Sequence, residues 1–114
     1  MSDYIFFIRG GDAYMAGLSE QEMQNHMQEW TDYMGGLGAA GKLKGGAPLG
    51  KDGTVMSGGA KAAIDGPLGG DTQVNGYVIV SAADMAEAKK LANDCPIFMA
   101  DGSLEIRECL DMSG

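Results

Sequence analysis

The stretch AAIDGPLGGDTQVNGYVIV, residues 62–80, joins the two halves of the chain. It starts and ends with an apolar run, and Asp65, Gly66 and Pro67 lie after the first of these. Gly66 permits a positive φ and Pro67 has no amide donor, so this pair interrupts regular strand pairing. We therefore expect a strand, a turn, a loop and a second strand here. Each half of the chain then supplies a strand–helix–strand unit.

The first strand is predicted at residues 4–9, YIFFIR, because aromatic and β-branched residues dominate it and Gly10 follows. Alternate side chains of a strand point to opposite faces, and both faces of this one are apolar. A strand of that kind is normally covered on both sides. Because the chain has enough helix for only one face, we predict that a second copy of the sheet covers the other face in a homodimer.

The first long helix is predicted to begin after Ser19, with residues 10–17 as a loop before it. Ser19 and Glu22 have the spacing of a capping box. Apolar residues then recur at helical spacing and form one stripe directed at the sheet, with His26 on its flank. The stripe consists of Met23, Met27, Trp30, Met34 and Leu37.

Further elements follow in an order that defines the fold class. A strand at residues 41–46, a turn at residues 51–53 and a short arm at residues 54–56 precede the central stretch. A second helix begins after Asp84 and ends before Pro96, with residues 104–107 as the last strand. The predicted buried stripe of this second helix is Met85, Ala88, Leu91, Ala92 and Cys95. This order predicts an α+β, ferredoxin-like split βαβ sandwich with two helices on one face of an antiparallel sheet.

Length and composition restrict the class of protein. A chain of 114 residues is expected to be one domain, residues 1–114. The net charge of −8 argues against a nucleic-acid partner, because affinity for phosphates depends on Lys and Arg. We expect no membrane span and a cytoplasmic location, since no apolar run approaches about 20 residues and no secretory signal pattern is present. Cys95 and Cys109 are then expected to be free thiols.

The glycine-rich segment GLGAAGK, residues 36–42, matches two phosphate-loop patterns. It leaves a predicted helix and enters a strand, whereas a phosphate loop runs from a strand into a helix. Leu43 also stands where a magnesium-binding Ser or Thr belongs. No Cys/His cluster has the spacing of a zinc site. We therefore expect no cofactor and no metal.

Two residues are candidates for catalysis, each with a structural alternative. His26, the one histidine, is either a general base or a helix-flank side chain that packs beside Trp30. Asp65 is either a carboxylate base or an acceptor of hydrogen bonds from the turn that follows it.

Charged residues of the first and last strands are candidates for ligand binding. These strands are neighbours in a ferredoxin-like sheet, and Arg9, Glu105 and Arg107 are expected on the face away from the helices. They either line a small polar cavity that accepts an anion or pair with one another. Trp30 completes the predicted ligand-binding set.

With these residues in order, the chain resembles the YCII-related, or DGPF, family from Tyr4 to Arg107. The resemblance implies a dimeric α+β barrel, in which two ferredoxin-like sheets face each other, and a His–Asp pair that only His26 and Asp65 could match. The motifs that carry it are YxFFIR (4–9), LS (18–19), WxxYMGGL (30–37), GKL (41–43), GGxPL (45–49), DGP (65–67), GY (76–77) and EIR (105–107). Leu68 replaces the usual Phe, and residues 69–73 replace an acidic–Lys–acidic stretch.

These observations lead to one leading hypothesis and two alternatives. The leading hypothesis is a homodimer that binds a small polar or anionic molecule in a cavity between the first long helix, the Asp65 loop and the sheet, with cofactor-free acid–base chemistry. The first alternative is a cofactor-independent monooxygenase, as in related dimeric barrels. The second is a non-catalytic interaction module, which predicts an exposed apolar patch and no pocket.

Overall fold

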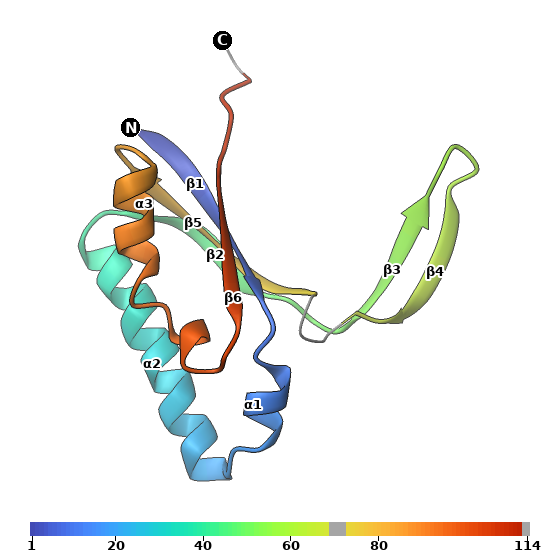
Figure 1. The fold of residues 1–114 in the computed structure, drawn as a ribbon, viewed down its shortest axis with the longest axis horizontal. Helices are drawn as coiled ribbons and strands as arrows, with labels where there is room; N and C mark the ends of the chain where they lie inside the picture. Colours follow the sequence, from blue (N-terminus) through green and yellow to red (C-terminus); the bar gives the residue numbers. More distant parts are fainter. Residues whose placement is uncertain (69–72, 113–114) are drawn as a thin grey trace.

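The computed structural model describes residues 1–68 and 73–112. A four-stranded antiparallel sheet with the order β2-β5-β1-β6 has its helices α2 and α3 on one face (Figure 1). The predicted α+β ferredoxin-like sandwich is therefore confirmed. Residues 69–73 stand in place of the acidic–Lys–acidic stretch, and residues 69–72 of this segment lie outside the described residues. The bounds are β1 (Ser2–Arg9), α1 (Asp12–Ala16), α2 (Glu20–Ala39), β2 (Leu43–Pro48), β3 (Asp52–Ser57), β4 (Ala62–Pro67), β5 (Val74–Ala82), α3 (Met85–Ala92), the 3₁₀ helix η1 (Pro96–Phe98) and β6 (Ser103–Glu108).

The core lies between the sheet and the two long helices. In β1 the side chains of Tyr4, Phe6 and Ile8 are buried, and those between them are only half-buried. The same alternation runs along β5, where Val78 and Val80 are buried. In each of these strands, the helices therefore cover one face and leave the other partly open.

Helix α2 begins as predicted but packs in a different rotation. Both bonds of the capping box between Ser19 and Glu22 are present. The buried residues of the helix are His26 and Leu37, whereas Met27 is 49 % exposed. The predicted stripe is wrong at Met27, and Trp30 is only partly buried. Hydrophobicity alone favours methionine over histidine inside, but His26 receives a hydrogen bond from Trp30 and packs against the Tyr14 ring, as described below.

The loop predicted at residues 10–17 contains a short helix, α1. Gly11 precedes it with a φ of 88°, a conformation that favours glycine. Asn75 in β5 donates hydrogen bonds to the Gly10 carbonyl and to the Asp12 carboxylate, at 3.1 and 3.3 Å. These bonds fix the start of α1 against the end of the sheet.

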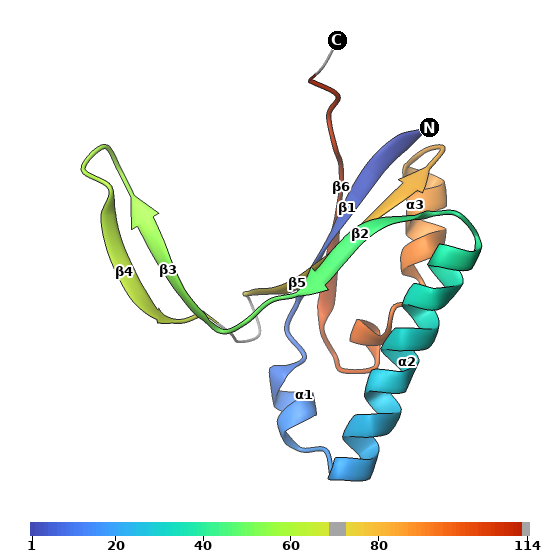
Figure 2. The ribbon, with the colours of Figure 1, turned by 180° about the vertical axis from the view of Figure 1, so that it is seen from behind.

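Strands β3 and β4 form a separate two-stranded hairpin, residues 52–67, which we call the arm. The turn predicted at residues 51–53 is wrong, because β3 starts there and the turn lies between Ser57 and Ala62. Pairing also continues through Gly66 and Pro67 to the end of β4. Proline is tolerated at such an edge, where no ladder amide is required. The arm extends from the body on the side away from α2 and α3 (Figures 1 and 2).

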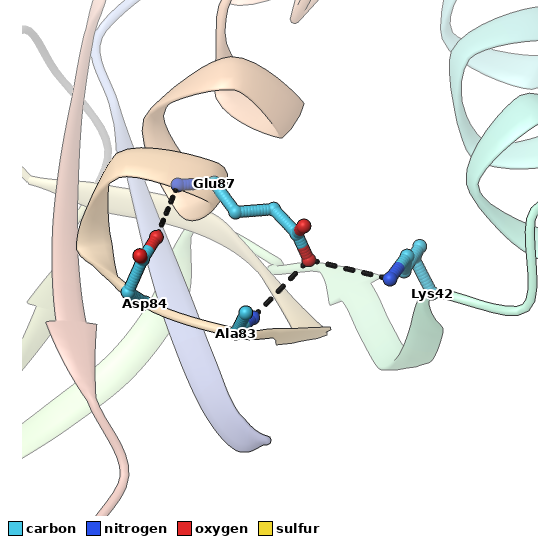
Figure 3. A network of polar contacts seen from close by, with 4 residues as sticks. All are labelled: Lys42, Ala83, Asp84 and Glu87. Atoms are coloured by element: carbon cyan, nitrogen blue, oxygen red, sulfur yellow. Dashed lines mark hydrogen bonds and ion pairs between the residues drawn. The ribbon is translucent and has the colours of Figure 1, made fainter.

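Helix α3 has an N-terminus tied to the sheet. The Asp84 carboxylate accepts the Glu87 amide at 2.8 Å, which confirms the predicted cap. Glu87 in turn accepts from the Ala83 amide and from Lys42 Nζ, both at 3.2 Å (Figure 3). The helix ends at Ala92, and Met85, predicted to be buried, is 38 % exposed. No helix among the described residues is long and apolar enough to span a bilayer.

The Glu87 contacts predict a pH-dependent contribution to stability. The Ala83 amide first, and then Lys42, lower the pKa of the Glu87 carboxyl. A lowered pKa in the folded state stabilises the protein at pH values above the ordinary carboxyl pKa, and this contribution is lost as the pH falls through the folded-state pKa. Glu87→Gln should therefore lower the urea midpoint at about pH 7, and the difference should shrink towards about pH 3.

Glu20→Gln removes an exposed carboxylate from α2 and serves as the matched control. A Glu87→Gln deficit that stayed constant between the two pH values would contradict this account.

Candidate functional site

A small hollow lies between α1 and the first three turns of α2. The chain can form it because Gly17 follows α1 directly and Ser19 then starts α2, so the two helices fold back on each other. Its volume is about 160 Å³. We call it the α1–α2 hollow. Its lining residues are Tyr14, Leu18, Glu22, Asn25, His26 and Glu29.

His26 is the buried polar side chain of this site, with 3 % of its surface exposed. The Trp30 indole N–H donates a hydrogen bond to Nε2 of His26 at 3.2 Å. The Tyr14 ring meets the imidazole edge-on, with ring centroids 5.5 Å apart. The alternative in which His26 packs beside Trp30 is thus present in the structure, and the imidazole also lines the hollow.

The Trp30 bond determines which nitrogen of His26 carries the proton. Nε2 accepts a hydrogen bond, so in a neutral ring the proton must reside on Nδ1. A proton on Nε2 would direct two N–H donors at each other. Nδ1 is buried and has no hydrogen-bond partner among the described residues. Its nearest carboxylate oxygen, Oε2 of Glu29, is 3.8 Å away, beyond hydrogen-bonding distance.

The charge around the hollow is negative. Glu22 and Glu29 line it, and its described lining includes no lysine or arginine. The hydrogen bond with the Ser19 backbone is the largest of the effects that lower the pKa of the Glu22 carboxyl, which favours its ionised form. Such a site favours a neutral ligand with hydroxyl donors over an anion. Among residues 1–68 and 73–112, no group of three or more His, Cys, Asp or Glu could hold a metal ion.

Asp65 occupies a different part of the molecule from His26. It lies on β4, exposed to solvent and opposite Thr54 of β3. The arm and α2 lie on opposite sides of the chain in both views (Figures 1 and 2). Within one chain, therefore, the structure does not bring His26 and Asp65 together.

The charged residues of the first and last strands do lie together, on the face away from the helices. Nη2 of Arg9 donates to Oε1 of Glu105 at 3.2 Å, which is the predicted ion pair. Arg107 is opposite Ile5 in the register of β1 and β6 and therefore shares this face. We call the face of the sheet away from the helices the open face.

Five of the six lining residues of the hollow were not predicted as site residues. Glu22 was predicted only as part of the helix cap, and Leu18 was not predicted to line a site. Glu29 could have been found, because it is one helical turn beyond His26. Asn25 adjoins His26 in the chain but gave no signal of its own. Tyr14 could not be found, because it lies on α1, in a segment predicted to be a loop.

The fold and the hollow define an α+β protein with a small polar site beside its first long helix. The family model for the YCII-related domain matches residues 12–113, and the chain therefore belongs to that family. No curated protein matches the sequence. A solved structure with a similar fold is 5-chloro-2-hydroxyhydroquinone dehydrochlorinase (TftG) from Burkholderia phenoliruptrix AC1100, in complex with 2,5-dihydroxybenzoquinone. The two share 13 % identity, with a TM-score of 0.58, over 95 % of this chain and 93 % of that one.

The tautomer of His26 can be tested directly, because it is the one histidine of the chain. At about pH 8.5, two units above the ordinary imidazole pKa of about 6.5, two-bond ¹H–¹⁵N spectra should show a protonated Nδ1 and an unprotonated Nε2. Trp30→Phe removes the donor, so the Nε2–H form should become populated.

Tyr33→Phe is the matched control. It alters a neighbouring ring of α2 whose hydroxyl donates to the Leu91 carbonyl at 2.7 Å and leaves the Trp30 bond in place. A protonated Nε2 in the unmodified protein would show that the bond between Trp30 and His26 does not form in solution.

Proposed function

We propose that the α1–α2 hollow binds a small, neutral, hydroxylated molecule and transfers a proton from it without a cofactor. The observation that carries this proposal concerns His26, a buried residue that lines the hollow. Its Nδ1 has no hydrogen-bond partner among the described residues. A buried polar group left unpaired costs about 1–3 kcal/mol. A ligand oxygen that accepted the Nδ1–H bond would remove this cost.

The geometry divides the chemistry between His26 and Glu29. With Nε2 engaged by Trp30, the neutral imidazole can only donate from Nδ1, so it is an electrophile rather than a base. The Glu29 carboxylate, 3.8 Å from Nδ1, is the proton acceptor. The ligand O–H bond breaks, the proton passes to Glu29, and the negative charge left on the ligand oxygen is stabilised by the Nδ1–H group.

The size of the hollow restricts the ligand class. Its volume of about 160 Å³ is the volume that roughly five molecules occupy in liquid water, at about 30 Å³ each. A single ring with one or two hydroxyl groups suits that space, and the Tyr14 ring supplies an apolar wall. The structural neighbour was solved with 2,5-dihydroxybenzoquinone, which supports a ring of this kind.

Titration with hydroquinone tests the proposal. Its two hydroxyl groups match the donor and acceptor of the site, and it is neutral near pH 7. We expect saturable shifts of the His26 ring and Trp30 indole resonances. Glu29→Gln should weaken binding about tenfold or more, because a hydrogen bond to a charged group contributes about 1.5–3 kcal/mol. His26→Gln should weaken it by a similar factor.

Asp32→Asn changes a carboxylate of α2 that does not line the hollow and is the matched control. The anion 4-hydroxybenzoate should bind more weakly than hydroquinone. Equal binding by the Glu29→Gln variant, or shifts that never saturate, would contradict the proposal.

We also propose that the chain forms a homodimer through the open face, with an enclosed space that suits a polar or anionic molecule. Two rows of cross-strand neighbours support this assembly. Tyr77, Phe7 and Glu105 form one row, and Ile79, Ile5 and Arg107 form the next. The apolar side chains of both rows are only half-buried, and the Arg9–Glu105 pair adjoins them. Two such faces in contact would pair apolar centres and enclose these charges.

Phe7→Lys should abolish the dimer, because a lysine at the centre of the contact leaves a charge without a partner. We expect the dissociation constant from sedimentation velocity to rise at least tenfold. Phe98→Lys is the matched control, since Phe98 is 49 % exposed on η1, away from the open face. A well-folded monomer in the unmodified protein at micromolar concentration would contradict the assembly.

A further inference from the structure

The arm carries an apolar surface that no other part of residues 1–68 and 73–112 covers. Val55 and Ile64 are direct cross-strand partners, so their side chains lie on the same face of the hairpin. They are 47 % and 71 % exposed, and Met56 is 61 % exposed. With the half-buried Gly66 as the one exception, all residues of β3 and β4 are exposed.

The arm also lacks the support that a two-stranded ribbon requires. β3 and β4 pair only with each other and form a sheet separate from that of the body. At its base, the Leu68 amide bonds to the Lys51 carbonyl at 2.6 Å, and Lys51 reaches Asp12 at 3.6 Å. An isolated two-stranded hairpin is at best marginally stable in water. A stable arm therefore implies a surface that covers its apolar pair.

We propose that the arm is a clamp that docks on a second copy of this chain through Val55 and Ile64. The inference depends on the homodimer proposed above and adds a second contact to it. The arm leaves the body from the ends of β2 and β5, on the side of the sheet away from α2 and α3 (Figures 1 and 2). A copy seated on the open face is thus on the same side as the arm. In a two-fold dimer, each arm docks on its partner in the same way.

The surface area that a stable dimer buries is a further argument that a second copy of this chain covers the arm. Stable interfaces bury roughly 800 Å² on each partner. An aromatic side chain can bury about 150–250 Å². Because Phe7 and Tyr77 are already half-buried, the two together leave on the order of 200 Å² for a partner to cover. These two central rings therefore supply only part of the required area. The arm, exposed almost throughout, supplies the additional surface.

The double variant Val55→Thr/Ile64→Thr tests the clamp in the full chain. Threonine keeps the branching at Cβ and the strand propensity, but its hydroxyl replaces a methyl group of Val55 and the ethyl group of Ile64. We expect the dimer dissociation constant, measured by sedimentation velocity, to rise at least tenfold while the far-UV circular dichroism stays unchanged. Phe98→Thr/Met99→Thr, which changes two residues of similar exposure (49 % and 55 %) beside the helices, should leave the constant unchanged.

Hydrogen exchange separates failure of the clamp from failure of the dimer, and it does not depend on how the arm variant folds. Amides of residues 52–67 should exchange at least tenfold more slowly in the unmodified dimer than in the Phe7→Lys monomer. Equal exchange in the two, or an unchanged dissociation constant in the arm variant, overturns the clamp and leaves the dimer intact. An unmodified protein that is monomeric at all concentrations overturns both. An arm protected only by another protein likewise overturns the clamp.

Discussion

The structure depends on the placement of β1 at the centre of the sheet with apolar side chains on both of its faces. One face, with Tyr4, Phe6 and Ile8, is buried beneath the helices. The other, with Ile5 and Phe7, is only half-buried because α2 and α3 lie on the opposite face (Figure 1). The ladder of hydrogen bonds to β5 and β6 fixes this division, since a slip of one residue would exchange the two faces. The same constraint leaves the open face as a surface for assembly.

Much of the fold could be predicted because local patterns determine it. The caps at Ser19 and Asp84 specify both long helices, and the alternation in residues 4–9 specifies the central strand. The rotation of α2 could not be predicted. Its stripe of methionines is more hydrophobic than the line that includes His26, and the contacts of His26 with Tyr14 and Trp30, which favour its burial, do not follow from spacing.

The candidate site shows even more clearly which features local sequence patterns do not predict. The sequence identified His26 as a candidate but paired it with Asp65, because the family resemblance implied a His–Asp pair. The structure shows a carboxylate one helical turn from His26, at Glu29, and places Asp65 on the arm. The bond from Trp30 matters most, since it determines which nitrogen of His26 faces a ligand. Such a bond depends on two side-chain rotations, and spacing alone does not specify them.

The hollow and the open face depend on different elements of one chain. The hollow is formed by α1 and the start of α2, whereas the open face is formed by the sheet. β1 links them, because it carries Arg9 on the open face and leads through Gly10 and Gly11 into α1. Gly11 is critical to this link. Its φ of 88° is strained for other residues, and a Cβ there would lie 3.1 Å from Ile97 of η1. A side chain at Gly11 would therefore displace α1 and Tyr14 from the hollow while the ladder of β1 stayed intact.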